Sequence, residues 1–249
     1  MRYIEVYVKT ALSKSNLENT DYALNPYRGC EHRCVYCYSP FVIHMPIEEW
    51  NNVVYVKKNL PTVLNKELKR KRGIISIGTV TDAYQPAEKI YGITRKSLDV
   101  LKRHRRKISL LTKSSLILRD MDIIKEIPEA EVGVSITAWR DEWRRKIEPH
   151  ASPIEERFQV LEEFRDKAIT YAFIGPIFKD IILEDMGNIL SELSRIGVSY
   201  VIFDRFRYKR GMLLPPFLES MVKSTDYSDL KRKIMRIAKS FELKFYFDW

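Results

Sequence analysis

Residues 22–38 read Tyr22-Ala23-Leu24-Asn25-Pro26-Tyr27-Arg28-Gly29-Cys30-Glu31-His32-Arg33-Cys34-Val35-Tyr36-Cys37-Tyr38. This stretch holds all three cysteines of the chain, in the spacing C-x3-C-x2-C, directly after a short apolar run. An odd number of cysteines packed so tightly is not a disulfide framework and is typical of a reducing compartment. Thiolates are soft ligands that favour iron–sulfur clusters, zinc or copper(I), so the stretch predicts a metal centre.

Outward from this stretch, apolar runs alternate with amphipathic ones. Strands are predicted at residues 22–24, 73–78, 108–112, 131–136, 168–174 and 198–203. Helices are predicted at residues 62–72, 94–104, 120–126, 153–166 and 184–195. A strand–helix unit repeated about six times predicts a parallel sheet with right-handed crossovers. We therefore predict an α/β fold, a partial (β/α)6 TIM-like barrel with parallel strands. The cysteines then lie at the carboxyl ends of the strands, where such barrels carry their sites.

The 249 residues contain no clear linker, so we predict a single domain over 1–249, with a helix and a strand within 216–249 as an extension. The helix after Ser152 is expected to begin with a capping box, since Glu155 lies three residues on. No stretch reaches the ~18 uncharged apolar residues of a membrane span, and residues 1–10 lack a signal-peptide core. We expect a cytoplasmic protein with no membrane partner.

The chain is basic, with a net charge of +10 and a pI near 9.4. The excess is concentrated in four runs, at residues 69–72, 102–107, 144–146 and 205–210. Such a surplus favours a polyanionic partner, usually nucleic acid. Equally, charged faces of this kind form the solvated ion-pair networks of heat-stable proteins. Charge alone leaves both readings open.

The cysteine spacing allows two kinds of metal centre. Three thiolates can hold three irons of a 4Fe–4S cube and leave the fourth iron open to a substrate or cofactor. Structural zinc is the alternative, with His32 or His44 as fourth ligand, and it would make the chain a zinc-stabilised nucleic-acid-binding protein without catalysis. Zinc sites of that type usually come as two separated pairs, which this sequence lacks. An electron carrier is a third possibility, although such proteins usually supply four ligands.

The cysteine motif, with an aromatic residue before the last cysteine, resembles that of the radical S-adenosylmethionine (SAM) superfamily. The wider string from Leu24 to Tyr38 is similar to the spore photoproduct lyase-related branch, a group of DNA repair enzymes. Further matches lie at residues 78–86, 111–114, 134–137 and 148–153. The resemblance covers about residues 20–215.

The resemblance implies that Cys30, Cys34 and Cys37 ligate a 4Fe–4S cluster and that SAM binds the open iron. An electron from the reduced cluster would cleave SAM to methionine and a 5′-deoxyadenosyl radical. The implied activity is a lyase or repair reaction on DNA or RNA, with a flavodoxin-type or ferredoxin-type electron donor as partner. In such enzymes the cofactors carry the hard chemistry and the protein orients them.

The resemblance also implies cofactor-binding roles for strand-end residues. Tyr36 matches the aromatic residue beside the adenine, and the positions that contact SAM in relatives are Thr81, Lys113 and Ser135. Asp82 and Glu148 are acidic candidates at the same end of the barrel. A Lys ammonium can pair with the methionine carboxylate, and hydroxyls can bond ribose or amino groups. Each residue also has an ordinary reading, as a core aromatic, a strand-end cap or a solvated charge.

One position departs from the lyase pattern. Spore photoproduct lyase has a hydrogen-donating cysteine where this chain has Thr79, and there is no cysteine outside the motif. Tyr36 and Tyr38 match tyrosines of the lyase's hydrogen relay, and Tyr84 lies nearby, so these tyrosines are the catalytic candidates. Spore photoproduct itself is not expected to be the substrate.

Overall fold

The computed structural model describes all 249 residues and is built on an eight-stranded sheet. The strand order is β11-β10-β9-β8-β7-β6-β3-β2, and every neighbouring pair except β2 and β3 is parallel. The strands of this sheet are β2 (Leu12–Lys14), β3 (Tyr22–Leu24), β6 (Ile75–Ile77), β7 (Ile108–Thr112), β8 (Glu131–Ser135), β9 (Ile169–Ile177), β10 (Tyr200–Arg205) and β11 (Phe245–Phe247). The parallel strands β3 and β6 to β10 confirm the predicted partial (β/α)6 barrel.

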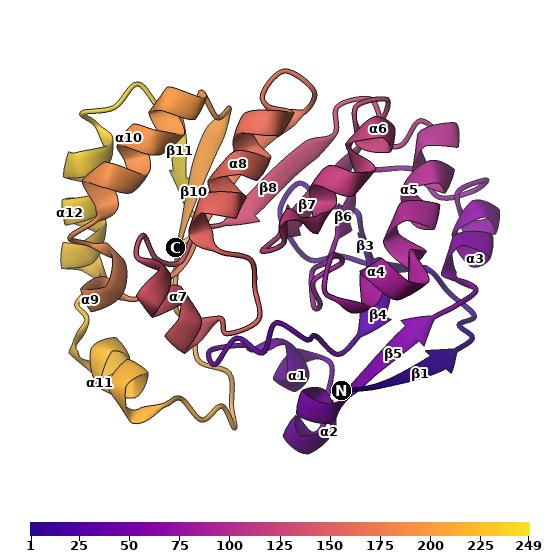
Figure 1. Cartoon of the computed structure of the whole chain (residues 1–249), viewed down its shortest axis with the longest axis horizontal. Coiled ribbons are helices and arrows are strands. Elements are labelled where there is room, and N and C mark those ends of the chain that lie inside the picture. Colours follow the sequence, from indigo (N-terminus) through magenta and orange to yellow (C-terminus); the bar gives the residue numbers. More distant parts are fainter.

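Helices connect the parallel strands and cover the outer face of the sheet (Figure 1). They are α3 (Leu60–Glu67), α4 (Ala87–Tyr91), α5 (Ile93–Arg103), the 3-10 helix η1 (Ser115–Asp120), α6 (Met121–Ile124), α7 (Asp141–Ile147), α8 (Ile154–Phe164), α9 (Lys179–Ile182), α10 (Met186–Ile196), α11 (Pro216–Ser224) and α12 (Tyr227–Ala238). Each parallel strand runs in the same direction, so the loops that follow the strands leave the sheet at the same end. The barrel therefore gathers several loops at one end.

The core lies between the sheet and the helices and contains 48 buried residues. In β7, Ile108, Leu110 and Thr112 alternate with partly exposed residues, as the period of a strand requires. Helix α8 turns Phe158, Leu161 and Phe164 inward, as its spacing predicts. The predicted capping box is wrong: Pro153 precedes the helix, and the Ser152 hydroxyl bonds Ser115 instead.

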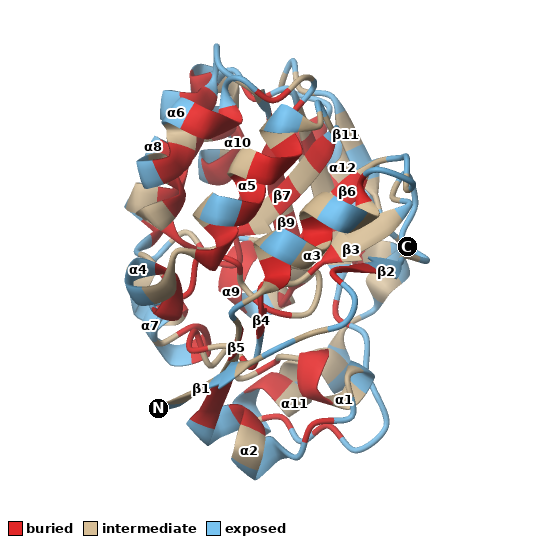
Figure 2. Ribbon diagram, turned by 90° about the vertical axis from the view of Figure 1, so that its right-hand side faces the viewer, coloured by how far each residue is buried: buried red, intermediate tan, exposed pale blue.

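A second, three-stranded sheet was not predicted. It has the order β1-β5-β4, from β1 (Arg2–Val6), β5 (Val53–Lys57) and β4 (Tyr27–Arg28). In Figure 2 this sheet lies below the barrel, at the same end as α11 and the short helices α1 (Ser39–Val42) and α2 (Ile47–Asn52). The loops that follow the parallel strands emerge at this end.

The C-terminal residues add to the barrel rather than standing apart from it. Strand β11 pairs with β10 in parallel register, and α12 packs on α10. The sequence predicts a final strand at residues 241–247, of which only Phe245–Phe247 form β11. None of the helices is both long and apolar enough to span a membrane.

Candidate functional site: a thiol loop at the carboxyl ends of the strands

The three thiols lie on the loop that follows β4, and close packing against β5 sets its entry. Gly29 has φ +97°, and a Cβ there would lie 2.4 Å from the backbone oxygen of Val53. Only glycine fits both the left-handed backbone and the close approach. Arg33, between the first two cysteines, also has a positive φ of 51°. The backbone of the thiol loop is therefore constrained at these two positions.

Side chains from the loop after β6 hold the start of the thiol loop. The Thr81 hydroxyl donates a hydrogen bond to the Gly29 carbonyl at 2.6 Å, and the Gln85 amide donates to the same oxygen at 3.1 Å. The Gln85 carbonyl oxygen accepts from the backbone N–H of Glu31 at 3.0 Å. Both side chains are buried. The predicted residue Thr81 thus reaches the site through the backbone just before Cys30.

Asp82 ties the thiol loop to two strand ends. Its carboxylate accepts hydrogen bonds from the Thr112 hydroxyl at 2.7 Å, from the Lys113 N–H at 2.9 Å and from the Tyr84 N–H at 2.8 Å. Its Oδ2 also lies 3.3 Å from Nδ1 of His32, which is buried inside the thiol loop. Burial alone would raise the pKa of Asp82, but the His32 ring and these donors hold it well below its usual value. His32, the residue that could complete a zinc site, therefore faces a carboxylate.

Lys113 and Ser135 lie side by side at the ends of β7 and β8. The Lys113 ammonium donates to the Ser135 hydroxyl at 3.3 Å. Burial lowers the pKa of Lys113, but the neighbouring Cys34 and the Glu148 carboxylate outweigh this effect, so the net pKa is raised. The lysine therefore remains a cation between a thiol and a carboxylate.

Glu148 is fully buried beneath the thiol loop. One of its carboxylate oxygens accepts the hydroxyl proton of Tyr36, and the other lies 2.6 Å from the guanidinium of Arg157, which is also fully buried. Burial would raise the pKa of Glu148, but Arg157 and Lys113 keep it below its usual value. The Tyr36 ring packs 5.6 Å from that of Phe178. Tyr36 and Glu148 are thus brought together, in the core under the cysteines.

Tyr38 lies on the outer side of the same loop, with 45% of its surface exposed. Partial burial, the neighbouring Cys37 and the carboxylate of Asp204 raise the pKa of its hydroxyl. Asp204 belongs to the end of β10, so Tyr38 faces the far edge of the open barrel. Tyr84 is placed elsewhere: it is buried, and its hydroxyl donates to Asp120 at 3.2 Å in a network with Arg119 and Glu88.

Thr79 stands at the position where the lyase pattern has a cysteine. Its hydroxyl accepts a hydrogen bond from the side-chain amide nitrogen of Asn25 at 3.0 Å. The backbone N–H of Val80 donates to the side-chain oxygen Oδ1 of Asn25 at 3.1 Å. The threonine thus joins the loop after β6 to the loop after β3. An aliphatic hydroxyl cannot replace the thiol in hydrogen-atom transfer.

The three thiols fit a metal cluster by their chemistry. All three thiols are free and partly buried. Burial raises the pKa of each, that of Cys30 to about 12. The neighbouring thiols of the loop add to the rise for Cys30 and Cys34. Such thiols stay protonated until a cation displaces the protons. No three Cys, His, Asp or Glu side chains form a group that could hold a single metal ion. A cluster does not require such a group, because each thiolate binds a different iron.

Only one of the basic runs reaches the site as an exposed segment, and in it Arg207 pairs with Asp204 and Asp248. Runs 69–72 and 102–107 precede β6 and β7, so they lie at the opposite end of the barrel. In run 144–146, Arg144 is buried, pairs with Asp141 at 2.8 Å and donates to the carbonyl of Ala151 at 3.2 Å. Run 205–210 follows β10 at the thiol end, and five of its six residues are exposed: Arg205, Arg207, Tyr208, Lys209 and Arg210.

Asp204, just before that run, is expected to make stability depend on pH. Burial raises its pKa to about 7, against the effect of Arg207 3.1 Å away. A carboxyl whose pKa is higher in the folded than in the unfolded chain binds its proton more tightly when folded. Its contribution to the free energy of unfolding therefore falls as the pH rises from about 4 towards 7. Asp204→Asn should be more stable than the parent at pH 8, with a smaller difference at pH 5.

Urea unfolding of both chains at the two pH values measures this difference. Asp166→Asn is the control, because that carboxylate is largely exposed and its loss should change stability little at either pH. An equal effect of Asp204→Asn at pH 5 and pH 8 would contradict the assignment of a raised pKa.

Sequence reasoning missed two residues that hold the site together, Arg157 and Gln85. Arg157 lies on the inward face of α8 beside Ile154 and Phe158. A lone charge among inward-facing apolar residues signals a buried ion pair, and that pattern could have revealed it. Gln85 offers no comparable signal, since its role depends on the backbone of a distant loop.

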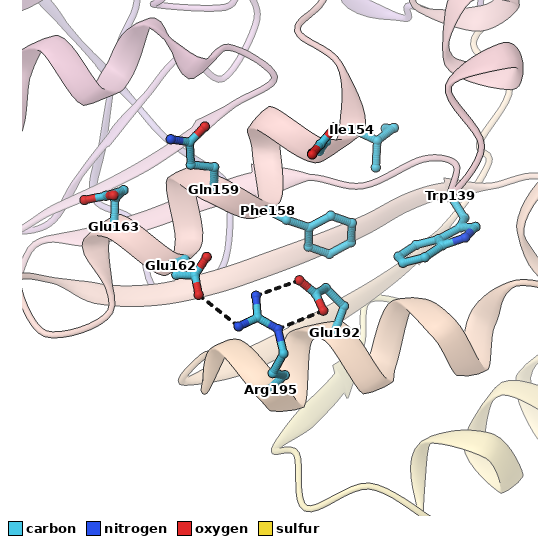
Figure 3. A pocket seen from close by; sticks show the side chains of 9 residues that line it. Trp139, Ile154, Phe158, Gln159, Glu162, Glu163, Glu192 and Arg195 are labelled. Atoms are coloured by element: carbon cyan, nitrogen blue, oxygen red, sulfur yellow. Dashed lines mark hydrogen bonds and ion pairs between the residues drawn. The ribbon is translucent and has the colours of Figure 1, made fainter.

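One surface hollow lies away from this site. Its nine lining residues come mainly from α8 and α10, with Trp139 and Phe158 at its floor (Figure 3). Across it, Arg195 bridges Glu162 at 2.9 Å and Glu192 at 2.8 Å. None of the thiols or strand-end residues lines it.

Comparison with known proteins shows to which family the chain belongs. The model of the radical SAM superfamily matches residues 24–193. An uncharacterised protein of Methanocaldococcus jannaschii, MJ0683, is 36% identical over 219 residues, which cover 87% of this chain and 82% of that protein.

Among solved structures, spore photoproduct lyase complexed with dinucleoside spore photoproduct superposes with a TM-score of 0.74 at 13% identity, covering 99% of this chain and 82% of that one. SuiB of Streptococcus suis, bound to S-adenosylmethionine, gives a TM-score of 0.65 at 12% identity over 91% of this chain and 50% of that one. At these identities the likeness is one of fold. The resemblance expected from the motifs is thus confirmed for the superfamily by its model and for the fold by the lyase. The family model matches more than half of the chain, and the thiol loop lies at the carboxyl ends of a partial barrel. The chain therefore belongs to the radical SAM superfamily.

Proposed function

We propose that this chain is an enzyme that holds a 4Fe–4S cluster through Cys30, Cys34 and Cys37 and cleaves SAM reductively. One observation carries the proposal: the free thiols share the strand ends with Lys113, whose ammonium donates only to the Ser135 hydroxyl. When bound, the cluster supplies the electron that splits SAM into methionine and a 5′-deoxyadenosyl radical. Membership of the superfamily favours this role over that of a zinc-stabilised binding protein.

The residues around the thiols divide into two groups by what their polar atoms already contact. Lys113 has one hydrogen bond, to Ser135, so its remaining donors are free to pair with the carboxylate of SAM, and Ser135 can bond the same molecule. Thr81 and Asp82 use their oxygens to hold the thiol loop and the strand ends. We assign them positioning roles. Tyr36 supports the loop from below through Glu148, with its ring in the apolar core next to Phe178.

Tyr38 is the residue we assign to the return of a hydrogen atom to the product radical. It is exposed at the thiol end, whereas Tyr84 donates its hydroxyl proton to Asp120 and Tyr36 donates its own to Glu148. A phenol can give up a hydrogen atom as a thiol does, so it can replace the thiol that Thr79 lacks. The electron donor would be a protein of the flavodoxin or ferredoxin type.

We further propose that the substrate is a nucleic acid. The exposed segment 205–210 emerges at the thiol end with four cations and Tyr208, of which 47% is exposed. Cations that track phosphates, interleaved with an aromatic residue on which a base can stack, are the usual means of binding single strands. The structural likeness to a lyase complexed with a dinucleoside supports the same class of substrate.

The test is formation of 5′-deoxyadenosine after anaerobic reconstitution with iron and sulfide and reduction with dithionite. We expect product from the parent chain, none above background from Cys34→Ala, and a higher rate when single-stranded DNA or RNA is added. The rate increase tests the substrate class independently of the radical chemistry.

Metal analysis of chain purified without oxygen accompanies this assay. Iron and sulfide with a brown absorbance are expected. One zinc per chain and no 5′-deoxyadenosine would overturn the proposal in favour of the zinc-stabilised binding protein.

A further inference from the structure

A cavity of about 560 Å³ lies between the small sheet and the open edge of the barrel. It is lined by residues of β1, β2, β4, β5 and the loops after β3 and β6: Val6, Val8, Ser13, Asn25, Tyr27, Arg28, Ile43, Glu49, Tyr55, Lys57 and Val80. Its volume falls in the range of about 300–1,000 Å³ typical of small-molecule sites. None of the residues assigned to the cluster or to SAM lines it.

Two cations in this cavity have no carboxylate partner. The Lys57 ammonium donates a single hydrogen bond, to the carbonyl of Asn25 at 2.7 Å, and the Arg28 guanidinium donates only to the carbonyl of Ile43 at 3.2 Å. Lys57 therefore keeps two free donors and Arg28 four. The two side chains thus bring two uncompensated positive charges to one cavity.

The two cations also repel each other. Partial burial and the charge of Arg28 lower the pKa of Lys57 to about 8. Glu49, the one carboxylate at the cavity, accepts the hydroxyl proton of Tyr55 at 2.5 Å. An anion that enters the cavity would meet free donors and relieve the repulsion between Lys57 and Arg28.

The cavity adjoins the proposed reaction site through Asn25 and Val80. Both line it, and both belong to the hydrogen-bonded contact that includes Thr79. The loop that carries Val80 continues directly into Thr81 and Asp82, which hold the thiol loop. A molecule in this cavity would therefore lie next to the backbone that shapes the thiol site.

We propose that this cavity binds a phosphate group of the nucleotide substrate, held by Lys57 and Arg28. The inference rests on the proposed function and makes it more specific, because it places a substrate phosphate on the β4–β5 side, away from the exposed segment 205–210. A guanidinium and an ammonium with free donors match the several acceptor oxygens of a phosphate. The phosphate could belong to a polynucleotide or to a mononucleotide.

The first experiment measures binding of a fluorescent twelve-residue oligothymidylate to the full chain at several salt concentrations. Lys57→Met should weaken binding by about tenfold or more, the usual effect of losing a charged hydrogen bond, and should reduce the salt slope by about one. Lys58→Met is the matched control. Lys58 is the next residue in sequence, is exposed, and already pairs with Glu5 at 2.5 Å, so its loss should leave affinity within about twofold.

The second experiment follows the Lys57 amine directly and does not depend on a variant that folds. A brief pulse of acetic anhydride at pH 8, read by mass spectrometry, should label Lys57 more than tenfold faster than exposed lysines such as Lys58. Oligothymidylate or 5′-AMP should protect Lys57, whereas adenosine, which has no phosphate, should not.

The probes separate the sources of the phosphate. Protection by the oligonucleotide supports a polynucleotide, and protection by 5′-AMP alone supports a mononucleotide. If neither protects Lys57, or adenosine protects it equally well, the inference is overturned. The 5′-deoxyadenosine assay on the parent chain is independent of these results, so a failure of the proposed function can be told from a failure of the cavity.

Discussion

Arg157→Met is expected to lower the free energy of unfolding by about 3–5 kcal/mol, the usual cost of leaving one member of a buried ion pair without its partner. Arg157 and Glu148 are both fully buried and lie 2.6 Å apart. The guanidinium also donates to the carbonyls of Ser152 at 3.0 Å and Ser135 at 2.9 Å. Methionine fills a similar volume but satisfies none of these groups. Urea unfolding of the two chains at pH 7 measures the loss.

Arg195→Met is the matched control for this prediction. Arg195 also contacts two carboxylates, Glu162 and Glu192, at 2.9 and 2.8 Å, but its side chain is exposed. Its replacement should hardly change the free energy of unfolding. Adding Glu148→Gln to Arg157→Met should recover part of the loss, because the amide removes the unpaired charge. Equal losses for the two arginine variants would mean that burial does not decide the effect.

Gly29→Ala is expected to remove most of the iron that the chain can hold after anaerobic reconstitution. An alanine Cβ would lie 2.4 Å from the Val53 oxygen, which is backbone and cannot turn aside. Overpacking of this kind costs about 1–3 kcal/mol, and the φ of +97° adds strain. The strain is relieved most easily by shifting residue 29 away from β5, which moves Cys30 with it. Iron and sulfide per chain are the measurement.

Gly92→Ala separates the clash from the backbone conformation. Gly92 also has a positive φ, +60°, but a Cβ there meets nothing within 4 Å. This variant should lose some stability and keep its iron. If Gly29→Ala binds as much iron as the parent, the close packing of the loop against β5 is not what places Cys30.

The barrel could be predicted from the sequence because its signals are local. Residues 108–112 form a strand with the predicted bounds, and α8 begins and ends within two residues of its prediction. The small sheet could not, since β4 has only two residues and β1 pairs with β5 across the whole thiol loop. The site divides in the same way. Lys113 and Ser135 could be placed because strand ends converge, whereas the contacts of Gln85 and His32 depend on how a loop folds back on the barrel.

The thiol loop is held from three directions before any metal is considered: Thr81 and Gln85 fix its first carbonyl, Asp82 faces its histidine, and Glu148 accepts the proton of its tyrosine. These partners come from different parts of the chain, so they meet only once the barrel has formed. The order of maturation follows from this. On the proposed function, the barrel would fold first and bind iron last, in contrast to small zinc modules, whose ligands fold around their ion. On the proposed function, the loop that supplies the cluster's ligands is therefore already positioned by contacts within the protein when iron binds.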